Sequence, residues 1–586
     1  MKSKIILAVL SILASTIAKS QFYVANKETI KVTVKGDLFV AEDLINNGNI
    51  TDLTIGGNNL QTVSGTGTIN TLTVNKKAGI VTGIGGMQTI TNMLTPTAGT
   101  FVAGGYVTLQ SDNNATAYGT SGNATITGLN IQHYLSSNQR GWRLIGSPFK
   151  TDVSLDFLSN ASNIDITYDG TTNAYGGAST ASANTYVPAT ESWSPINLGG
   201  AWAQNSAIAL FIRGTKGEGI PGTGPGWVSG SDYIGGTNYP SFVTLSGRGT
   251  LNVSDATFAV IPSRNNIISN PFAAPISLNA VLADNAVGFS NVIGYYSAVK
   301  GASDVRKNAG GYENELPSAN DIFIPPMGSF VINSITGTSF KVRASAINTS
   351  EIPTPNVLGI TNGSNISFVI IGSDSVYYDK LTIRFDANAS SAAGDKYDFL
   401  KMQNTNFDLY SIGSDYQMLS YDNRNVSDSG QIIPLGVRST MQKNFNFNFT
   451  NDLGVRVILN DKLLNKQTDV TEGNNYNFAV TADTLTQGDN RFELIINPKT
   501  LIPVIPPAFK INIYPNPSTD FVYVELPPGN DTYNISLTDA YGRVSQSVTS
   551  SQSLVKLPVK LLSNGVYFLK VDNGKINIMT KSIIKE

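Results

Sequence analysis

Apolar and polar residues alternate in short runs along most of this 586-residue chain, with turn residues between the runs. The stretch NFNFNF at 444–449 alternates strictly, and runs such as ISFVIIG, DKLTIRF and GVRVIL are rich in β-branched and aromatic residues. These patterns predict β-strands, because successive side chains of a strand point to opposite faces. Over 351–498 we therefore expect a β-sandwich in which some strands have one face in water.

A second pattern repeats between residues 21 and 130. Triplets recur every 17 to 21 residues, as VTV, LTI, LTV, TIT, VTL and ATI beginning at Val32, Leu53, Leu72, Thr89, Val107 and Ala124. This period predicts a β-solenoid, in which each turn of the coil buries its apolar residues against its neighbours. Some sugar-cleaving enzymes are solenoids with acidic clusters on one face. The acids of this segment do not follow the repeat, so we favour a passive spacer or a binding surface.

The middle of the chain contains two similar segments, which predict two related β-modules at 131–260 and 261–346. GWRLIGSPFK matches NNIISNPFAA, and the prolines of the two stretches, Pro148 and Pro271, are 123 residues apart. A later run, IALFIRG, is echoed by GSFVINS. In each copy the apolar run is expected to be a strand that ends before the proline, which cannot donate to a β-ladder.

All the tryptophans lie in the first module and allow two interpretations. An exposed row would stack against sugar rings, whereas a core or strand-edge position is the commoner use of this side chain. We favour core packing for Trp142, Trp193, Trp202 and Trp227.

Composition supports an all-β, multi-domain chain and narrows its chemistry. Only 14% of residues are charged and 55 are glycine, which suits short strands and tight turns. The net charge of −2 provides no long-range attraction for nucleic acid. The chain has no cysteine and one histidine, which excludes thiol nucleophiles and multi-histidine metal sites. His133 could act as a general base, but a partly buried imidazole beside Tyr134 is favoured.

The remaining chemistry would depend on carboxylates. Asp386, Asp395 and Asp398 lie close together in FDANASSAAGDKYDFLK and could bind calcium, or could cap turns, which we favour because no calcium-loop signature is present. No spacing singles out a catalytic carboxylate pair. We therefore expect no enzymatic activity, no metal and no cofactor.

The N-terminus has the pattern of an export signal. Lys2 and Lys4 precede the apolar stretch IILAVLSILASTI, and small residues follow it. We expect residues 1–20 to be a signal peptide, cleaved between Ser20 and Gln21. No later segment has the 18 consecutive apolar residues that a membrane helix needs.

The C-terminal segment is set apart by composition. A proline-rich stretch at 499–510 predicts a linker, and the runs from 511 to 586 predict a compact sandwich of about seven strands. Asp539 and Gly542 suit a tight turn between two strands, and Asn573-Gly574 suits a hairpin.

Four pieces of this segment, YPNPSTD, LTDAYGRVSQS, LLSNGVYFLKV and the basic tail KSIIK, occur in an order that resembles the type A C-terminal sorting domain of the type IX secretion system of Bacteroidota. The resemblance covers 511–586 and implies an immunoglobulin-like fold. It also implies recognition by an outer-membrane translocon and removal by a sortase-like protease, which joins the passenger to surface lipopolysaccharide. One position departs from the pattern, because Ser545 stands where an apolar residue is common.

The resemblance also implies which residues form the sorting motif. The motif positions here would be Pro515, Asn516, Pro517, Asp539, Gly542, Arg543, Gly565, Tyr567 and Lys570.

The remainder of the chain is similar, more loosely, to large surface proteins of the same phylum. We expect an exported protein whose passenger is adhesin-like or structural and contacts glycans, other cells or matrix. The alternative is a secreted carbohydrate-active enzyme or a glycan-binding accessory protein. It predicts a carboxylate pair in a cleft or an exposed tryptophan row.

Overall fold

The computed structural model divides into two compact units, residues 1–500 and 501–586. It describes residues 22–24, 38–135, 137–167, 181–197, 199–218, 240–297, 311–315, 321–350, 368–373, 377–386, 388–404, 406–425, 430–497, 511–526, 532–540, 542–572 and 577–586. The expected signal peptide, its cleavage site at Ser20 and Gln21, and the expected linker lie outside these ranges. Within them the elements are strands apart from two short α-helices and two 3-10 turns, which confirms the all-β fold class. None of the helices described is long and apolar enough to span a membrane.

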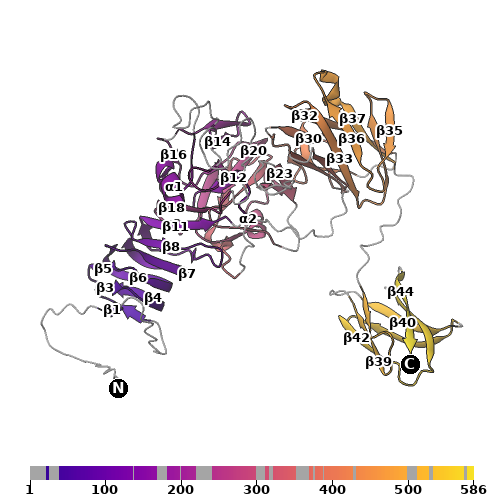
Figure 1. The fold of residues 1–586 in the computed structure, drawn as a ribbon, viewed down its shortest axis with the longest axis horizontal. Coiled ribbons are helices and arrows are strands. Elements are labelled where there is room, and N and C mark those ends of the chain that lie inside the picture. The colour runs from indigo at the N-terminus through magenta and orange to yellow at the C-terminus, as the bar shows by residue number, and fades with distance from the viewer. Residues whose placement is uncertain are drawn as a thin grey trace. The chain divides into compact units, whose positions relative to one another are not determined.

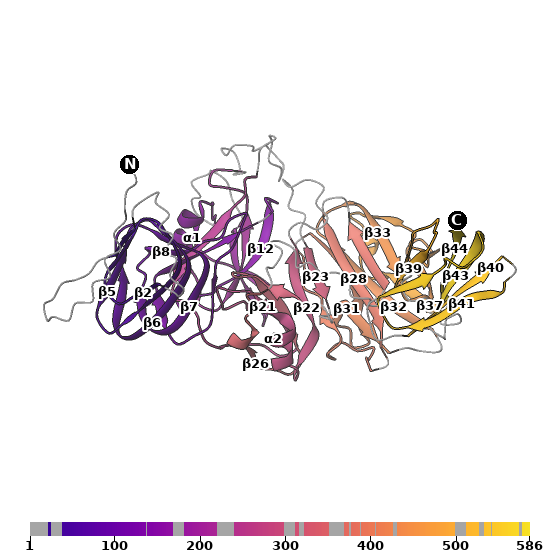
Figure 2. The ribbon, with the colours of Figure 1, turned by 90° about the horizontal axis from the view of Figure 1, so that it is seen from below.

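The N-terminal region is a β-solenoid-like coil of parallel strands, as the repeat predicted (Figure 2). We call this region the coil. Its strands are β1 (Phe22–Val24), β2 (Leu38–Val40), β3 (Leu44–Asn46), β4 (Asn49–Gly57), β5 (Gln61–Ser64), β6 (Thr68–Gly83), β7 (Gln88–Val102), β8 (Val107–Leu109), β9 (Tyr118–Gly119) and β10 (Thr125–Thr127). Because β4, β6 and β7 pair in register, Leu53, Leu72 and Leu94 stack in one buried column.

The register differs from the predicted repeat at two points. The triplet at Ala124 does not follow the one at Val107, because Ile126 pairs with Phe101 of β7. The triplet at Thr89 does not follow the one at Leu72, because Thr89 pairs with Thr68 and Thr108, whereas Leu72 pairs with Leu94. Strands β6 and β7 are 16 and 15 residues long, and the triplet at Leu72 lies inside β6, whereas the triplet at Thr89 lies at the start of β7. The first triplet, VTV, lies outside the described residues.

The two β-modules contain the same elements in the same order. The first consists of β11 (Leu129–Tyr134), β12 (Gly141–Gly146), β13 (Val153–Ser154), α1 (Leu155–Ser162), β14 (Ala183–Val187), β15 (Ser192–Pro195), β16 (Ala201–Trp202), β17 (Ala207–Ile212) and β18 (Thr244–Gly249). The second consists of β19 (Ala256–Ala259), β20 (Arg264–Ser269), β21 (Ile276–Ser277), α2 (Leu278–Asp284), β22 (Phe289–Ser297), β23 (Gly311–Glu315), β24 (Phe323–Ile324), β25 (Ser329–Ser334) and β26 (Ser339–Val342), followed by the 3-10 turn η1 (Ala344–Ala346).

The duplication extends to strand pairing and helix capping. The sheet orders β12-β17-β14-β15 and β20-β25-β22-β23 correspond strand by strand. Each helix begins after a serine whose hydroxyl accepts a backbone N–H: Ser154 from Phe157 and Ser277 from Ala280, both at 3.0 Å. Such caps satisfy one of the free amides of a helix N-terminus.

The module boundaries differ from the predicted ones. Strand β19 is the counterpart of β11, so the second module already begins at Ala256 and not at 261. At residue 130 the sheet is continuous, because β11 pairs with β8 of the coil on one side and with β18 on the other. The coil and the first module consequently share one hydrophobic core.

The sandwich is one curved sheet of eleven strands that encloses its own core. Its strands are β27 (Phe368–Ser373), β28 (Tyr378–Phe385), β29 (Phe399–Leu400), β30 (Phe407–Ile412), β31 (Met418–Arg424), β32 (Gln431–Ser439), β33 (Lys443–Asn451), β34 (Arg456–Asp461), β35 (Lys466–Asp469), β36 (Tyr476–Val480) and β37 (Gly488–Asn497), with the 3-10 turn η2 (Thr484–Thr486). Phe445, Phe447 and Phe449 are buried and the asparagines between them face outward, as the alternation predicted.

The terminal unit packs two sheets around a core of its own (Figure 1). Its strands are β38 (Asn512–Tyr514), β39 (Phe521–Glu525), β40 (Tyr533–Asp539), β41 (Val544–Ser550), β42 (Leu554–Pro558), β43 (Gly565–Asp572) and β44 (Asn577–Lys585). They form the sheets β38-β39-β42 and β41-β40-β43-β44. These are seven strands in the described part of 511–586. The hairpin predicted at Asn573-Gly574 lies outside the described residues.

Candidate functional site

The turn between β38 and β39 holds the last strand of the terminal unit. Pro515, Asn516 and Pro517 are exposed, and Ser518 is buried. The Asn516 side chain accepts the Ile584 N–H at 2.8 Å through Oδ1, and through Nδ2 it donates to the Ser582 carbonyl at 2.9 Å. A side-chain amide has one acceptor and one donor group, so Asn516 pairs with β44 as a neighbouring strand would.

Ser518 extends the same pairing toward the end of β44. Its backbone N–H donates to the Ile584 carbonyl at 2.9 Å, and its carbonyl accepts the Glu586 N–H at 3.0 Å. The Ser518 hydroxyl donates to the Phe521 carbonyl at 2.8 Å, which closes the turn. Sequence reasoning did not include Ser518 among the motif residues, although it directly follows the second proline.

The second motif cluster is the tip of the β40–β41 hairpin. The carboxylate of Asp539 accepts the Arg543 N–H at 3.0 Å and its Nε–H at 2.8 Å. Gly542 has a φ of 80°, a left-handed conformation that glycine adopts without steric cost. The Arg543 side chain is 77% exposed, so the hairpin presents a positive charge to solvent.

The third cluster lies on β43. Gly565 begins this strand, and the hydroxyl of the buried Tyr567 donates to the Ser563 carbonyl at 3.0 Å. Lys570 is half-exposed and lies 3.3 Å from the carboxylate of Asp572.

Strand pairing brings most of these residues to one end of a sheet. Asp539 is opposite Tyr567, Tyr567 is opposite Ile583, and the next residue, Ile584, bonds to Asn516. Segments that are far apart in the sequence therefore form one continuous surface. Lys570 lies farther along β43, where it pairs with Ser536 and Thr580.

The exposed apolar side chains of this sheet adjoin the same end. Val566 is 47% exposed, Phe568 42% and Ile584 43%. Val566 and Ile584 are directly paired, and Phe568 is the next outward residue of β43. Exposed apolar groups that lie side by side are typical of contact surfaces.

In the passenger, His133 lies on β11 and is half-buried. Its Nδ1 is shielded from solvent, and burial lowers the pKa of the imidazole to about 4. A neutral ring beside Tyr134, which stacks on Phe242 with 5.8 Å between centroids, is the arrangement that we favoured from the sequence.

The acids that could have formed a calcium site bind backbone amides. Asp386 accepts the Asn388 N–H at 2.8 Å, Asp395 accepts the Ser390 N–H at 2.8 Å, and Asp398 accepts the Asn423 N–H at 2.8 Å. Among the residues that the structure describes, no group of three acidic or histidine side chains is arranged to hold a metal.

Other acids of the sandwich are buried in ion pairs. Lys401 Nζ lies 2.8 Å from Asp379 and 3.3 Å from Asp408. Burial raises the pKa of Asp379 to about 6, with Lys401 acting in the opposite direction. Burial would lower the pKa of Lys401, but the two carboxylates outweigh it and raise that pKa. Arg491 pairs in the same way with Asp461, at 3.0 Å.

The tryptophans that the structure describes pack against protein. Trp202 is fully buried, the Trp142 ring meets Phe211 edge-on at 5.2 Å, and the Trp193 ring lies 5.2 Å from that of Tyr186. Trp227 lies outside the described residues.

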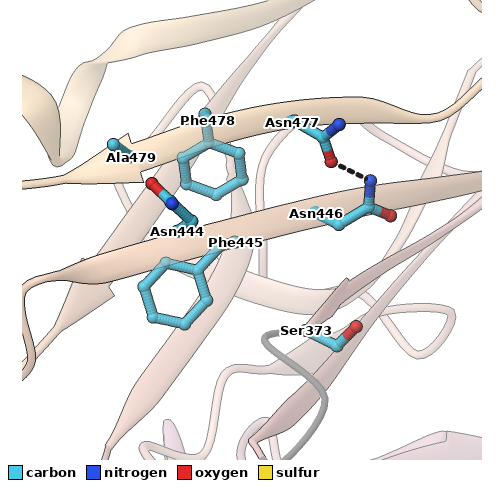
Figure 3. Close-up of a pocket in the computed structure, with 7 residues that line it drawn as sticks. All are labelled: Ser373, Asn444, Phe445, Asn446, Asn477, Phe478 and Ala479. Carbon is cyan, nitrogen blue, oxygen red and sulfur yellow. Dashed lines mark hydrogen bonds between the residues drawn. The ribbon is translucent and has the colours of Figure 1, made fainter.

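A shallow hollow of about 560 Å³ opens on the sandwich where β27, β33 and β36 lie side by side (Figure 3). It is lined by Ser373, Asn444, Phe445, Asn446, Asn477, Phe478 and Ala479.

Comparison with known proteins identifies the terminal unit only. Residues 512–585 match the family model of the secretion system C-terminal sorting domain. No curated protein matches the chain. The match confirms the resemblance seen in the sequence, and it covers the clusters around Asn516, Asp539 and Tyr567. The chain therefore carries, at 512–585, a type IX secretion C-terminal sorting domain, which directs its export to the cell surface or the surrounding medium.

Proposed function

We propose that the surface formed by the Pro515–Ser518 turn, the Asp539–Arg543 hairpin tip and the adjoining ends of β43 and β44 is what the export machinery recognises. The observation that supports this proposal is that these segments converge. The exposed Arg543 lies at the tip of the β40–β41 hairpin, and the exposed Val566 and Ile584 lie on β43 and β44 of the same sheet. A folded surface is consistent with a domain that is read as a unit and then removed. The partners would be an outer-membrane translocon and a sortase-like protease.

The test is fractionation of a host that expresses the full chain beside a truncation after Lys510. We expect the full chain to reach the surface or medium with the mass of the sorting domain lost, and the truncated chain to be retained. Equal export of the truncated chain would contradict the proposal. Mass spectrometry of the exported form also tests the expected N-terminal cleavage between Ser20 and Gln21.

We further propose that the passenger, residues 21–500, acts without catalysis as an adhesin-like or structural surface protein. The supporting observation is how the described passenger uses its acidic side chains. Asp379 and Asp461 hold strands together through buried ion pairs, and Asp395 caps a turn. Buried pairs of this kind satisfy charge inside the fold and leave these carboxylates without a role in proton transfer to a substrate.

Packing between the modules supports the same proposal. The coil and the first module share one core, and the second module packs on the sandwich through Tyr312, Val292, Phe399 and Tyr421. Such continuous packing suits a protein that presents fixed surfaces.

The alternative, a carbohydrate-active enzyme, can be tested directly. Purified exported protein would be incubated with a panel of polysaccharides, and release of reducing ends would be measured. We expect none above that of a heat-denatured control. Cleavage of any polysaccharide would overturn the non-enzymatic proposal and leave the export proposal untouched.

A further inference from the structure

The hollow on the sandwich has a row of amide and hydroxyl side chains at its centre. Ser373 on β27 is paired with Asn446 on β33, which is paired in turn with Asn477 on β36. Asn446 Nδ2 donates to Asn477 Oδ1 at 2.6 Å (Figure 3). Among the described residues this bond leaves Asn446 Oδ1 as an acceptor and Asn477 Nδ2 as a donor, both available toward the hollow.

Asn444 adds a second amide from the same face of β33, and Figure 3 shows its side chain beside the hollow. The amide group of the Asn444 side chain makes no hydrogen bond among the described residues. The site thus offers donors and acceptors on three adjacent strands, where the sheet fixes their spacing. Phe445 and Phe478 are buried in the core beneath, so they support the strands and do not offer a stacking face.

None of the seven lining residues is ionisable. A charged ligand would find no opposite charge there to compensate its lost hydration, which is costly. A neutral ligand with many hydroxyl groups would match the site, because each hydroxyl can both donate and accept a hydrogen bond, as the free amide atoms require.

On this face of the sheet, the side chains of the open part differ in kind from those that the second module covers. Thr450, Val369, Thr382 and Tyr421 form one row across β33, β27, β28 and β31. At the β31 end, Tyr421 is buried in a cluster with Tyr312 of the second module. The covered end of the face therefore carries the aromatic Tyr421, whereas the open part is lined by amides. A surface meant for another protein module would be expected to continue the aromatic pattern.

We propose that this hollow binds a neutral oligosaccharide through Asn444, Asn446, Asn477 and Ser373. The inference rests on the proposed adhesin-like function and names its site and the chemical class of its ligand. It requires no covalent step and no cation.

The experiment uses the purified exported protein and affinity electrophoresis in gels that contain a neutral β-glucan, mannan or galactan, with a sulfated polysaccharide as the charged comparison. We expect retardation by at least one neutral polysaccharide. Asn446→Leu and Asn477→Thr should each weaken it by about tenfold, the effect of losing one or two hydrogen bonds. Thr450→Leu, on the same face of β33 but outside the hollow, should bind as the parent does. Circular dichroism and the melting temperature confirm that each variant folds.

Three results would overturn the inference: no retardation by any neutral polysaccharide, unchanged retardation of both asparagine variants, or binding of the sulfated polysaccharide alone. Adhesion of cells that display the chain is measured in parallel. Adhesion that persists in both asparagine variants would contradict this site while leaving the adhesin-like proposal intact. Cleavage of the polysaccharide would contradict that proposal, whereas the comparison of variants would still decide whether the hollow is the binding site.

Discussion

Asn516 and Ile584 are 68 residues apart in the sequence and are joined by a hydrogen bond of 2.8 Å from the Ile584 N–H to the Asn516 side chain. Together with the bond from Asn516 to the Ser582 carbonyl, it ties an exposed turn to the last strand. The PNP turn of the sorting motif thus contains a residue that holds β44 in place.

Replacing Asn516 by alanine removes both bonds. Each is expected to contribute about 0.5–1.5 kcal/mol, so we expect Asn516→Ala to destabilise the terminal unit by about 1–3 kcal/mol. Hydrogen exchange of the amides of β44, followed by mass spectrometry, measures the effect locally. Asn512→Ala is the matched control, because among the described residues the Asn512 side chain bonds only to the carboxylate of Glu525, on the neighbouring strand β39. Equal exchange in the two variants would show that Asn516 does not hold the strand.

Arg543→Ala separates stability from recognition. The Arg543–Asp539 pair is largely exposed on the arginine side, and exposed ion pairs contribute about 0–1 kcal/mol. We expect the melting transition of the terminal unit to change little and export to fall severalfold in the fractionation assay. Arg456→Ala, which removes a similarly exposed pair with Asp469 in the sandwich, should leave export unchanged. Normal export of Arg543→Ala would remove this residue from the recognition surface.

Lys401→Met tests the buried cluster of the sandwich. The substitution leaves Asp379 and Asp408 buried without their cation, and breaking a buried pair from one side costs about 3–5 kcal/mol. We expect a loss of that size in urea unfolding of the passenger. Lys462→Met, at a pair with Glu493 in which the lysine side chain is 40% exposed, should cost less than about 1 kcal/mol. Similar losses in the two variants would argue against a special role for burial at Lys401.

Asp398 predicts a pH dependence. Burial raises the pKa of its carboxyl to about 9. The hydrogen bond from the Asn423 N–H and the positive charge of Arg424 lower this pKa, whereas the negative charges of Asp395 and Asp422 raise it. At pH 5–8 the folded protein therefore keeps a proton that the unfolded chain, with an ordinary carboxyl pKa near 4, releases. Stability should fall as pH rises through this window, by up to about 1.4 kcal/mol per pH unit.

Asp398→Asn removes this proton uptake and should flatten the pH dependence of the urea midpoint between pH 5 and 8. It should also raise stability most at the alkaline end of the range. A variant that keeps the slope of the parent would show that Asp398 is ionised in the folded state. The backbone carbonyl of Asp398 accepts the Ser290 hydroxyl at 2.6 Å, so this residue lies where the second module contacts the sandwich, and the substitution leaves that bond in place.

Much of the fold was accessible from local patterns. The alternation at 444–449 placed Phe447 inside and Asn446 outside, and the paired prolines Pro148 and Pro271 marked equivalent strand ends in two modules. Spacing was less informative in the coil, where Leu72 of one triplet pairs with Leu94 and not with the next triplet at Thr89. A repeat length counts residues along the chain and does not tell which of them are side by side.

The sorting motif was recognised from its order in the sequence, but its geometry was not. Local pattern determines which face of a strand is buried, because neighbouring side chains alternate. The tertiary structure alone decided that Asp539, Tyr567 and Ile583 align across three strands, and that Lys76 is buried against the carbonyls of Gly56 and Asn59. Strand pairing depends on the packing and hydrogen bonds of segments far apart in the chain, and a pattern read along the sequence does not contain them.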